Sequence, residues 1–332
     1  MEIDFVILWV NGNDPKWKDE LAQYSKENSG DKSKIRFRDW DNLQYIFRAF
    51  EEFTPWVRKI HFVTWGHVPE WLNTSHPKLN IVNHKDYIDI NNLPVFNANP
   101  LEINLHNIPG ISEQFVFFND DFFLTAPIEN ERFFQNGLPC DSLISNALSS
   151  SSGVGHFVLN NLEALNRHIN RREVLKKNRR KWFHYSYGMD MLRNLALLPW
   201  SRFTGFVDPH MPQPFLKSTF QEVWEKESEV LEETSASKFR SCSDVNQYLF
   251  RYWQLAKGNF VPISMRDTKY ITMNMTNLRR GEVSAMIASP KYTMICLNDD
   301  ESIDTDEVFE EAKQIVKDAF EKILPEKSSF EL

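Results

Sequence analysis

A short apolar run that ends in two adjacent carboxylates constrains this chain more than any other stretch. Phe115 to Phe118 are consecutive apolar residues, the pattern of a strand buried on both faces. The run ends at Asn119, Asp120 and Asp121, and further apolar residues follow directly. Neighbouring side chains of a strand point to opposite faces, so both aspartates can reach one ligand only if the strand ends there. Carboxylates at the carboxyl end of a strand suit a divalent cation held with phosphates, or a general base. A simple Asn-Asp turn between two strands is the alternative.

The order of the other apolar runs predicts the fold class. Residues 3–10 have the pattern of a central parallel strand, and residues 59–65 and 78–83 that of further short strands. Apolar side chains recur at helical spacing within residues 39–53, between the first two of these strands. Because strands and helices alternate, we expect an α/β protein with a Rossmann-like, mostly parallel, doubly wound sheet.

Composition and charge exclude several classes of protein. The 38 basic and 46 acidic residues give a net charge of −8, which argues against a general nucleic-acid-binding protein. The three cysteines are widely spaced, which predicts neither a disulfide framework nor a zinc site and fits a reducing compartment. No apolar run reaches membrane-spanning length and no signal-peptide pattern is present. We therefore expect a cytoplasmic protein without a transmembrane segment.

The middle of the chain departs from this pattern. From residue 137 the composition shifts to glycine, proline and a run of four serines, which predicts a flexible insert. Residues 161–181 have a helical pattern and end with seven basic side chains. We interpret residues 137–185 as a flexible or helical insert or lid within a single domain that spans residues 1–332. The basic cluster is a candidate anion-binding patch, with a solvated helix face as the alternative.

Candidate functional side chains also occur outside the aspartate pair. The turn at Asn11 and Gly12 follows the first strand, where α/β proteins receive nucleotides, although it matches neither a GxGxxG nor a Walker sequence. Arg48 follows an apolar pair on its predicted helix and lies at the edge of the buried face, unless it is simply solvated. His210 lies between prolines, which would hold its ring rigidly for proton transfer, although most isolated histidines are structural.

Taken together, blocks along the chain resemble the Stealth family, the hexose-1-phosphate transferases of capsular and cell-surface polysaccharide synthesis. The same family includes the catalytic subunit of the lysosomal-enzyme N-acetylglucosamine-1-phosphotransferase. The blocks are IDFVILWVNGND at residues 3–14, the region from RFRD at 36–39 to NDD at 119–121, DPHMP at 208–212 and RSCSDVN at 240–246. Residues 296–299 and 324–331 also resemble the C-terminus of that family.

The resemblance implies a nucleotide-sugar-binding catalytic domain and a set of functional positions. Its implied catalytic residues are Asp120, Asp121, His210 and Arg240. Its implied substrate-binding residues are Asp4, Trp9, Asn11, Arg48 and Asn298, and we add Gly12, the glycine of the first turn. The implied partners are a nucleotide-sugar donor, which we expect to be UDP-linked, and a growing or lipid-linked glycan acceptor. Peripheral membrane association through that acceptor is compatible with the sequence.

The implied reaction is attack by an acceptor hydroxyl on the phosphorus next to the donor hexose, with UMP leaving. Asp120 and Asp121 would hold Mg²⁺ or Mn²⁺, or one of them would act as a base. His210 would accept the hydroxyl proton or bond a phosphate oxygen. Arg48 and Arg240 would clamp phosphates.

Other functions stay open on the sequence alone. An ordinary glycosyltransferase would also use a nucleotide-sugar sheet with an acidic pair, but it would attack the anomeric carbon and release UDP. A glycan-binding module would explain the aromatic share of 14%, but it needs neither the aspartates nor the arginines. A sugar-nucleotide hydrolase would share the phosphate chemistry without needing an acceptor site.

Overall fold

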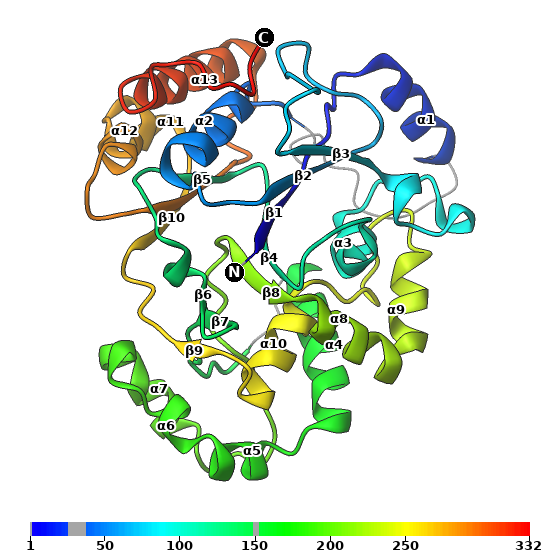
Figure 1. The fold of residues 1–332 in the computed structure, drawn as a ribbon, viewed down its shortest axis with the longest axis vertical. Coiled ribbons are helices and arrows are strands. Elements are labelled where there is room, and N and C mark those ends of the chain that lie inside the picture. Colours follow the sequence, from blue (N-terminus) through cyan, green and yellow to red (C-terminus); the bar gives the residue numbers. More distant parts are fainter. Residues whose placement is uncertain (1, 26–37, 149–152) are drawn as a thin grey trace.

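The fold is built around a five-stranded sheet with the strand order of a Rossmann-like domain. The computed structural model describes residues 2–25, 38–148 and 153–332, and its main sheet has the order β3-β2-β1-β4-β8 (Figure 1). The first four of these are mutually parallel, and β8 runs antiparallel to β4. The strands are β1 (Ile3–Leu8), β2 (Lys59–Thr64), β3 (Leu79–Asn83), β4 (Gln114–Phe118) and β8 (Gln213–Leu216). The predicted fold class and all four predicted strands in residues 3–118 are confirmed.

The strand order determines where a ligand can bind. The chain moves outward from β1 through β2 to β3 and then returns to add β4 on the other side of β1. The order therefore reverses between β1 and β4, and the carboxyl ends of these two strands flank the switch point at which open α/β sheets bind ligands. The loop at Asn11 and the aspartates after β4 both lie at this edge.

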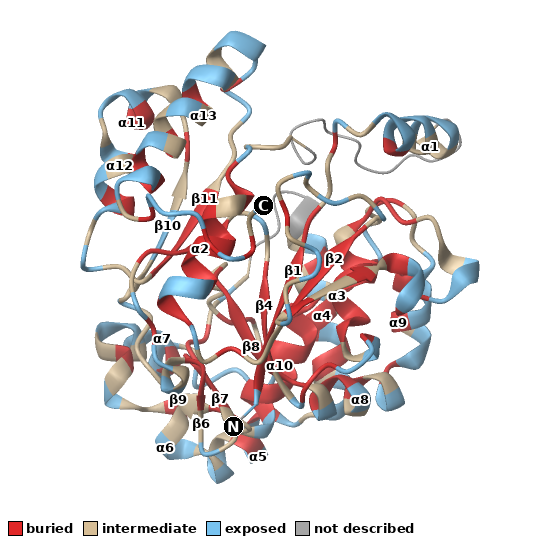
Figure 2. Ribbon diagram, turned by 45° about the horizontal axis from the view of Figure 1, so that its top comes forward, coloured by how far each residue is buried: buried red, intermediate tan, exposed pale blue. Residues whose placement is uncertain are grey.

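Side chains of β1 alternate between two apolar cores, one on each face of the sheet. Phe5 and Ile7 belong to one core, and Val6 and Leu8 to the other. Burial on both faces explains why the parallel strands are continuous apolar runs rather than alternating ones (Figure 2). The first core includes side chains of α2 (Leu43–Phe53) and α13 (Asp306–Glu321), and the second those of α3 (Ala98–Ile103), α4 (Gly153–His168), α8 (Lys217–Lys226) and α10 (Tyr248–Lys257).

A second sheet begins immediately after the aspartate pair. It has the order β10-β11-β5, with β5 antiparallel to β11. Its strands are β5 (Phe122–Leu124), β10 (Thr268–Thr272) and β11 (Met294–Asn298). Cys296 lies opposite Phe122, and the Leu297 amide donates a hydrogen bond of 3.0 Å to the carbonyl oxygen of Asp121. The two aspartates therefore lie at the junction of two sheets, and the strand does end where they begin.

The segment after residue 137 is more ordered than the sequence predicts. β7 (Leu138–Asp141) pairs with β6 (Phe134–Gln135) and β9 (Val261–Pro262), and residues 139–145 are buried. A flexible insert is therefore wrong for this part, because its apolar side chains pack into the core. The four serines lie outside the described residues. The single-domain division and the lid role of residues 137–185 stay predictions.

The basic helix predicted for residues 161–181 is divided into several pieces. α4 ends at His168, and α5 (Arg171–Lys177) and α6 (Arg179–Trp182) follow, with α7 (Met191–Ala196) beyond them (Figure 1). The Asn170 side chain accepts hydrogen bonds from the first amides of α5, so it starts a new helix where the prediction continues the old one. Among the described residues, no helix is long and apolar enough to cross a bilayer.

Candidate active site

Asp121, His210 and Cys296 form a compact cluster at the junction of the two sheets. Their potential ligand atoms all lie within 4.8 Å of one another. Asp121 Oδ2 is 3.6 Å from His210 Nε2 and accepts a hydrogen bond of 3.3 Å from Cys296 Sγ. The second carboxylate oxygen of Asp121, Oδ1, is buried and has no hydrogen-bond partner among the described residues. The fold thus brings together two predicted catalytic residues and one cysteine that the sequence analysis did not select.

Asp120 carries the second carboxylate of the pair in a different environment. Its side chain is accessible to solvent, although the surrounding protein weakens its hydration. This loss of hydration, together with the negative charges of Asp121 and Asp39, raises the pKa of Asp120 to about 7. A bound cation would offset both effects, because it compensates the lost hydration and the repulsion between carboxylates.

Asp39 is a third carboxylate in this region, and sequence reasoning considered it only as a possible N-cap of the helix that follows. Burial raises the pKa of Asp39, and its negative charge acts on Asp120. Arg38 holds the neighbouring backbone in place through two hydrogen bonds to Asp299, of 2.9 and 2.5 Å. Asp299 directly follows Asn298 at the end of β11, so this ion pair attaches the chain around Asp39 beside the aspartate pair. The RFRD block at residues 36–39, which contains Asp39, was the sequence signal that could have identified it.

Glu102 is a further functional candidate that the sequence analysis missed. This glutamate on α3 is buried, and its Oε2 has no hydrogen-bond partner among the described residues. Burial raises the pKa of Glu102 to about 6, although the positive charges of Arg240 and His210 act in the opposite direction. The side chains of Arg240 and His210, both predicted to be catalytic, therefore lie close enough to interact with the same buried glutamate. No motif surrounds Glu102 in the sequence, so only its position within an apolar stretch could have drawn notice.

The backbone and neighbours of His210 hold its ring in one place. His210 has a φ of 46°, a left-handed conformation that is uncommon for a residue other than glycine. Asp208 anchors the loop by accepting hydrogen bonds from Arg251 at 2.8 Å and from the Tyr252 hydroxyl at 2.5 Å. The edge of Phe122 packs against the imidazole, with ring centroids 5.0 Å apart. These contacts provide the rigidity that the flanking prolines predict.

The environment of His210 also changes its protonation. Burial by itself disfavours the imidazolium, but the carboxylates of Asp121, Glu102 and Asp208 outweigh burial and raise the pKa of His210. The distance of 3.6 Å to Asp121 exceeds a hydrogen bond, so Nε2 is not committed to that carboxylate.

The loop after β1 forms the other side of the switch point. The Asn11 amide donates a hydrogen bond of 2.7 Å to His67 Nε2, and the Asn11 side chain accepts one from the Asn13 amide at 2.9 Å. Trp9 is buried beneath this loop, where its ring stacks on Phe62 at 5.6 Å. The structure therefore places Asn11 and its neighbour Gly12 at the predicted edge, and it gives Trp9 a supporting position in the core.

Asp4 is not brought to the site. It lies at the opposite, amino-terminal end of β1, where its fully buried carboxylate accepts hydrogen bonds from Arg58 at 2.8 Å and from the Ser112 amide at 2.8 Å. Its partner in β4 is Phe115, five residues before Asp120. At about 3.3 Å per residue, roughly 16 Å separates the two aspartates along the strand. The substrate-binding role implied for Asp4 is therefore wrong, because the ion pair with Arg58 uses its carboxylate structurally.

Arg48 is likewise occupied elsewhere. Its guanidinium donates two hydrogen bonds to Glu331, of 2.9 and 3.0 Å, and further ones to Glu321 at 3.3 Å and the Leu324 carbonyl at 2.8 Å. The side chain is buried on α2, where it attaches the C-terminal tail. These contacts nearly exhaust its donors, so the structure contradicts the predicted phosphate clamp at Arg48.

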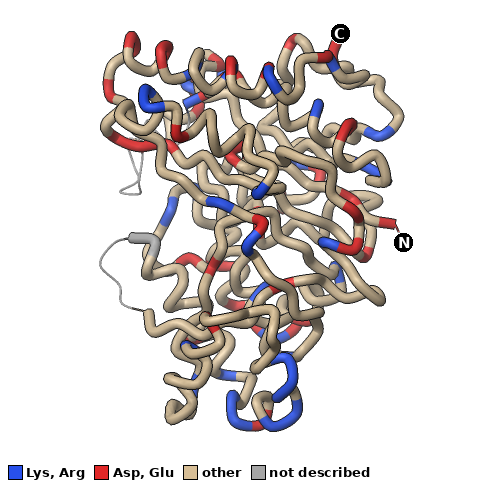
Figure 3. Tube along the Cα trace, turned by 90° about the vertical axis from the view of Figure 1, so that its left-hand side faces the viewer, with Lys and Arg blue, Asp and Glu red and all other residues tan. Residues whose placement is uncertain are grey.

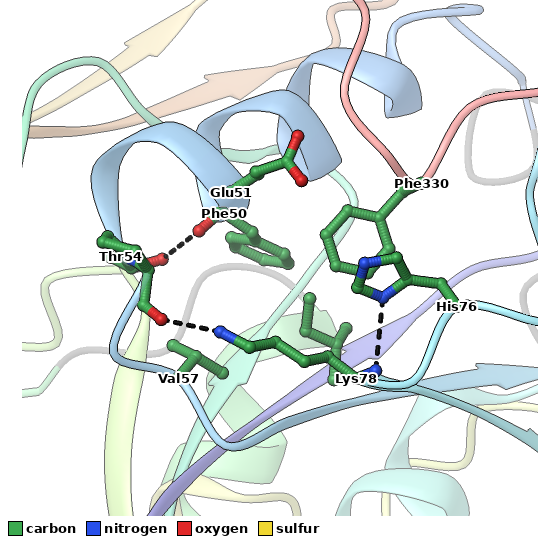
Figure 4. Close-up of a pocket in the computed structure, with 9 residues that line it drawn as sticks. Phe50, Glu51, Thr54, Val57, His76, Lys78 and Phe330 are labelled. Atoms are coloured by element: carbon green, nitrogen blue, oxygen red, sulfur yellow. Dashed lines mark hydrogen bonds between the residues drawn. The ribbon is translucent and has the colours of Figure 1, made fainter.

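A small apolar pocket of about 110 Å³ lies beside this tail and is structural (Figure 4). Phe50, Val57 and Phe330 contribute to its lining. Its polar groups are satisfied internally, since Lys78 Nζ donates to the Pro55 carbonyl at 2.6 Å. We therefore assign the pocket no part in the site.

Arg240 and Asn298 complete the account of the predicted residues. Arg240 is half-buried, and its charge acts on Glu102. Asn298 ends β11, next to the amide that bonds the Asp121 backbone, and its side chain donates to the Asp299 carbonyl at 2.8 Å. Both therefore belong to the region of the cluster.

The donor atoms of the site fit a hard divalent cation better than a soft one. Burial and the nearby charges of Asp121 and Asp120 raise the pKa of the Cys296 thiol far above its usual range. The protonated thiol donates a hydrogen bond to Asp121 and so positions that carboxylate. Asp121 Oδ1, which has no hydrogen-bond partner within the described part of the chain, and the accessible carboxylate of Asp120 are oxygen ligands of the kind that magnesium and manganese prefer.

The fold and the site together define an α/β protein with a carboxylate, histidine and arginine cluster at the switch point of a Rossmann-like sheet. Family models for the Stealth protein match in order: conserved region 1 at residues 1–29, conserved region 2 at residues 36–140 and conserved region 3 at residues 209–253. The chain belongs to the Stealth family, and the resemblance read from the sequence is confirmed.

Relatives cover almost the whole chain. The capsular polysaccharide phosphotransferase WcwK of Streptococcus pneumoniae is 41% identical over 99% of this chain and 98% of its own length. The receptor polysaccharide phosphotransferase WefC of Streptococcus gordonii is 40% identical over 100% and 99%. The exopolysaccharide phosphotransferase cps2G of Lactiplantibacillus plantarum is 36% identical over 99% and 96%. Among solved structures, the galactosyltransferase LgtC in complex with donor and acceptor sugar analogs is 9% identical, with a TM-score of 0.41 over 96% of each chain. A similarity that distant adds nothing to the assignment.

Proposed function

We propose that this protein is a hexose-1-phosphate transferase of capsular or cell-surface polysaccharide synthesis. It would move a sugar 1-phosphate from a nucleotide-sugar to a hydroxyl of a glycan acceptor, which creates a phosphodiester linkage. The observation that carries this proposal is the approach of His210 to Asp121 at the switch point of a chain 41% identical to a capsular polysaccharide phosphotransferase. A proton acceptor, a carboxylate pair and an arginine are the groups that phosphoryl transfer needs.

His210 is the proposed general base. The acceptor oxygen forms a bond to the phosphorus, the bond from phosphorus to the nucleoside phosphate breaks, and the leaving nucleoside monophosphate takes the electron pair. The hydroxyl proton moves to His210 Nε2, whose 3.6 Å distance from Asp121 leaves it free of a hydrogen bond to that carboxylate. The Asp121 carboxylate then stabilises the imidazolium, as the raised pKa of His210 indicates.

Arg240 is the proposed phosphate ligand, and Glu102 positions it. A planar guanidinium can donate two parallel hydrogen bonds to one phosphate, which a lysine cannot. Because Glu102 is buried and interacts with both Arg240 and His210, it couples the phosphate ligand to the base. With Arg48 bound to the C-terminal tail, Arg240 alone keeps the clamp role among the two predicted arginines.

Asp120 and Asp121 would hold Mg²⁺ or Mn²⁺, and Asp39 would add negative charge nearby. When bound, such a cation neutralises the oxygens of the donor pyrophosphate and of the leaving phosphate. The protein supplies the oriented carboxylates: the Cys296 thiol and the β5–β11 backbone pairing hold Asp121 in position.

The donor would be a UDP-linked hexose, with the Asn11 and Gly12 turn under the nucleotide and Asn298 as a further substrate-binding residue. The acceptor would be a growing or lipid-linked glycan. We accordingly place the protein in the cytoplasm, at the inner face of the membrane that carries such an acceptor.

Identifying both products tests this proposal. Incubated with a UDP-hexose and a glycan acceptor, the protein should release UMP and form a product with a phosphodiester signal in the ³¹P NMR spectrum. Release of UDP with a phosphorus-free product would instead establish an ordinary glycosyltransferase. Release of UMP at the same rate without acceptor, together with free hexose 1-phosphate, would establish a hydrolase.

A further inference from the structure

Residues 171–202 form a strongly basic end of an acidic molecule. This segment contains nine lysines and arginines but only two acidic residues, a net charge of +7 in a chain whose net charge is −8. Figure 3 shows these basic residues gathered at the end of the molecule where α5 and α6 lie. We call this segment the basic-apolar surface, because large apolar side chains accompany the charges.

Exposed apolar side chains are concentrated on the same segment. Of the eleven exposed large hydrophobic side chains among the described residues, six belong to it, with exposed fractions from 39% to 86%. They are Tyr185, Met189, Leu192, Leu195, Leu198 and Trp200. Single exposed apolar residues are normal on a protein surface, but a concentration of this kind marks an interaction site.

Some basic side chains of this surface are hydrogen-bonded to the rest of the protein, and others are exposed to solvent. Arg171 donates a hydrogen bond of 3.0 Å to the Leu197 carbonyl, and Lys181 donates two of 2.6 Å to the carbonyls of Gly258 and Phe260. These two residues therefore hold the surface against the core. Seven basic side chains of the segment are exposed to solvent and form no salt bridge with a described residue: Arg172, Lys176, Lys177, Arg179, Arg180, Arg193 and Arg202. Four of them, Lys176, Lys177, Arg179 and Arg180, lie together on and between the two short helices α5 and α6.

A groove of about 760 Å³ runs between the basic helices and α7. Leu175, Phe183, Leu195 and Leu198 contribute apolar lining, and the same groove is bordered by the basic side chains of residues 176–181. The surface thus offers apolar contact area immediately beside positive charge.

We propose that the basic-apolar surface docks on an anionic lipid bilayer. Lysine and arginine would contact the phosphate headgroups, while Tyr185, Leu192 and Trp200 enter the boundary between headgroups and acyl chains. Charge complementarity favours an anionic surface, because each basic residue near such a membrane adds attraction. A soluble polyanion would use the charges but not the exposed apolar side chains, and so explains only half of the surface. Docking would bring the enzyme to a membrane independently of the acceptor in its active site.

Vesicle co-sedimentation tests the charge contribution. The wild-type protein should bind vesicles of phosphatidylcholine mixed with phosphatidylglycerol, bind phosphatidylcholine alone weakly, and detach at high salt. Replacing Lys176, Lys177, Arg179 and Arg180 by glutamine should lower the partition coefficient by about tenfold or more. The matched control removes the same number of exposed charges elsewhere, at Lys16, Lys226, Lys291 and Lys322, and should keep near-wild-type binding.

A second variant tests the apolar contribution. The double substitution Leu192→Ser with Trp200→Ser should weaken binding to the anionic vesicles, whereas the control Val68→Ser with Ile90→Ser, which also removes exposed apolar side chains, should not. Brominated acyl chains should quench tryptophan fluorescence in the wild type, and Trp200→Phe should remove most of that quenching. All of these positions are exposed, so thermal melts should be unchanged and loss of folding can be separated from loss of docking.

Several outcomes would overturn this inference. They are equal binding to neutral and anionic vesicles, equal losses in the surface and control variants, or retention on soluble polyphosphate without vesicle binding. Because the vesicle assay needs no donor, its result is independent of the proposed reaction. Transfer to a short water-soluble acceptor should proceed at the wild-type rate in the glutamine variant.

Discussion

His210 Nε2 lies 3.6 Å from Asp121 Oδ2, and this relationship joins two halves of the chain at one edge of the sheet. Asp121 follows the carboxyl end of β4, while His210 enters from the loop before the antiparallel strand β8. β4 and β8 are hydrogen-bonded neighbours, so the approach of the two side chains follows from strand pairing. The pairing of β4 with β8 therefore places the Asp121 carboxylate beside His210, the proposed general base.

Removing the imidazole should abolish most turnover. His210→Ala should lose on the order of 10²–10⁴-fold in kcat, the usual contribution of a positioned proton acceptor. His156→Ala, which removes an exposed histidine on α4, serves as the control and should leave kcat unchanged. Steady-state kinetics at saturating donor would measure both. Near-normal turnover in His210→Ala would reduce His210 to a structural residue of its loop.

The turnover rate should increase with pH, and the midpoint of this increase should lie above the ordinary pKa of histidine. A general base works in its neutral form, and the neighbouring carboxylates raise the pKa of His210, so the neutral form is reached only at higher pH. In Asp121→Asn one of these charges is gone, so the acidic limb of the residual activity should move to lower pH. Profiles of kcat against pH for both proteins would show this shift. An unmoved limb would mean that another group titrates.

Cation affinity should strengthen as the pH rises through about 7. Asp120 has a pKa raised to about 7, so protons compete with the cation below that value and cease to compete above it. Titration calorimetry with Mn²⁺ at several pH values would measure the affinity without any turnover. Asp120→Asn should bind the cation more weakly and lose this pH dependence. Equal affinity in the variant and the wild type would remove Asp120 from the cation site.

The two aspartates should be needed for activity but not for folding. Asp120→Asn and Asp121→Asn should each lower kcat by on the order of 10²-fold or more, because oriented charge is the main source of phosphoryl-transfer catalysis. Melting temperatures should stay within a few degrees of the wild type, and an excess of chelator should abolish wild-type activity. Full activity in chelator would favour a base role for one aspartate.

Arg240 and Arg48 should give opposite phenotypes. Arg240→Lys should lose about 10- to 150-fold in activity, the equivalent of one charge-assisted contact, while the melting temperature changes little. Arg48→Met should instead lower stability by roughly 3 kcal/mol, because it leaves the half-buried Glu331 without its partner. Thermal melts with and without UDP would separate the two. A normal UDP-induced shift in Arg240→Lys would show that Arg240 does not touch the nucleotide phosphates.

Local patterns in the sequence determined much of this protein. The apolar run before Asp120 predicted a strand buried on both faces, and the carboxylates after it were expected where that strand ends. Turn chemistry placed Asn11 at the end of β1, and flanking prolines marked the His210 loop. Periodicity and turn residues act over a few positions, so a single sequence displays them completely.

Partners distant in the chain were decided only by the tertiary structure. Asp4 and Arg48 are charged side chains beside apolar runs, and no local pattern shows that Arg58 and Glu331 neutralise them. Glu102 likewise became a candidate only when packing buried it close to the base and the arginine and left its Oε2 without a hydrogen-bond partner among the described residues. The role of a charged group depends on its hydration and on the charges around it, and both arise when segments far apart in sequence pack together.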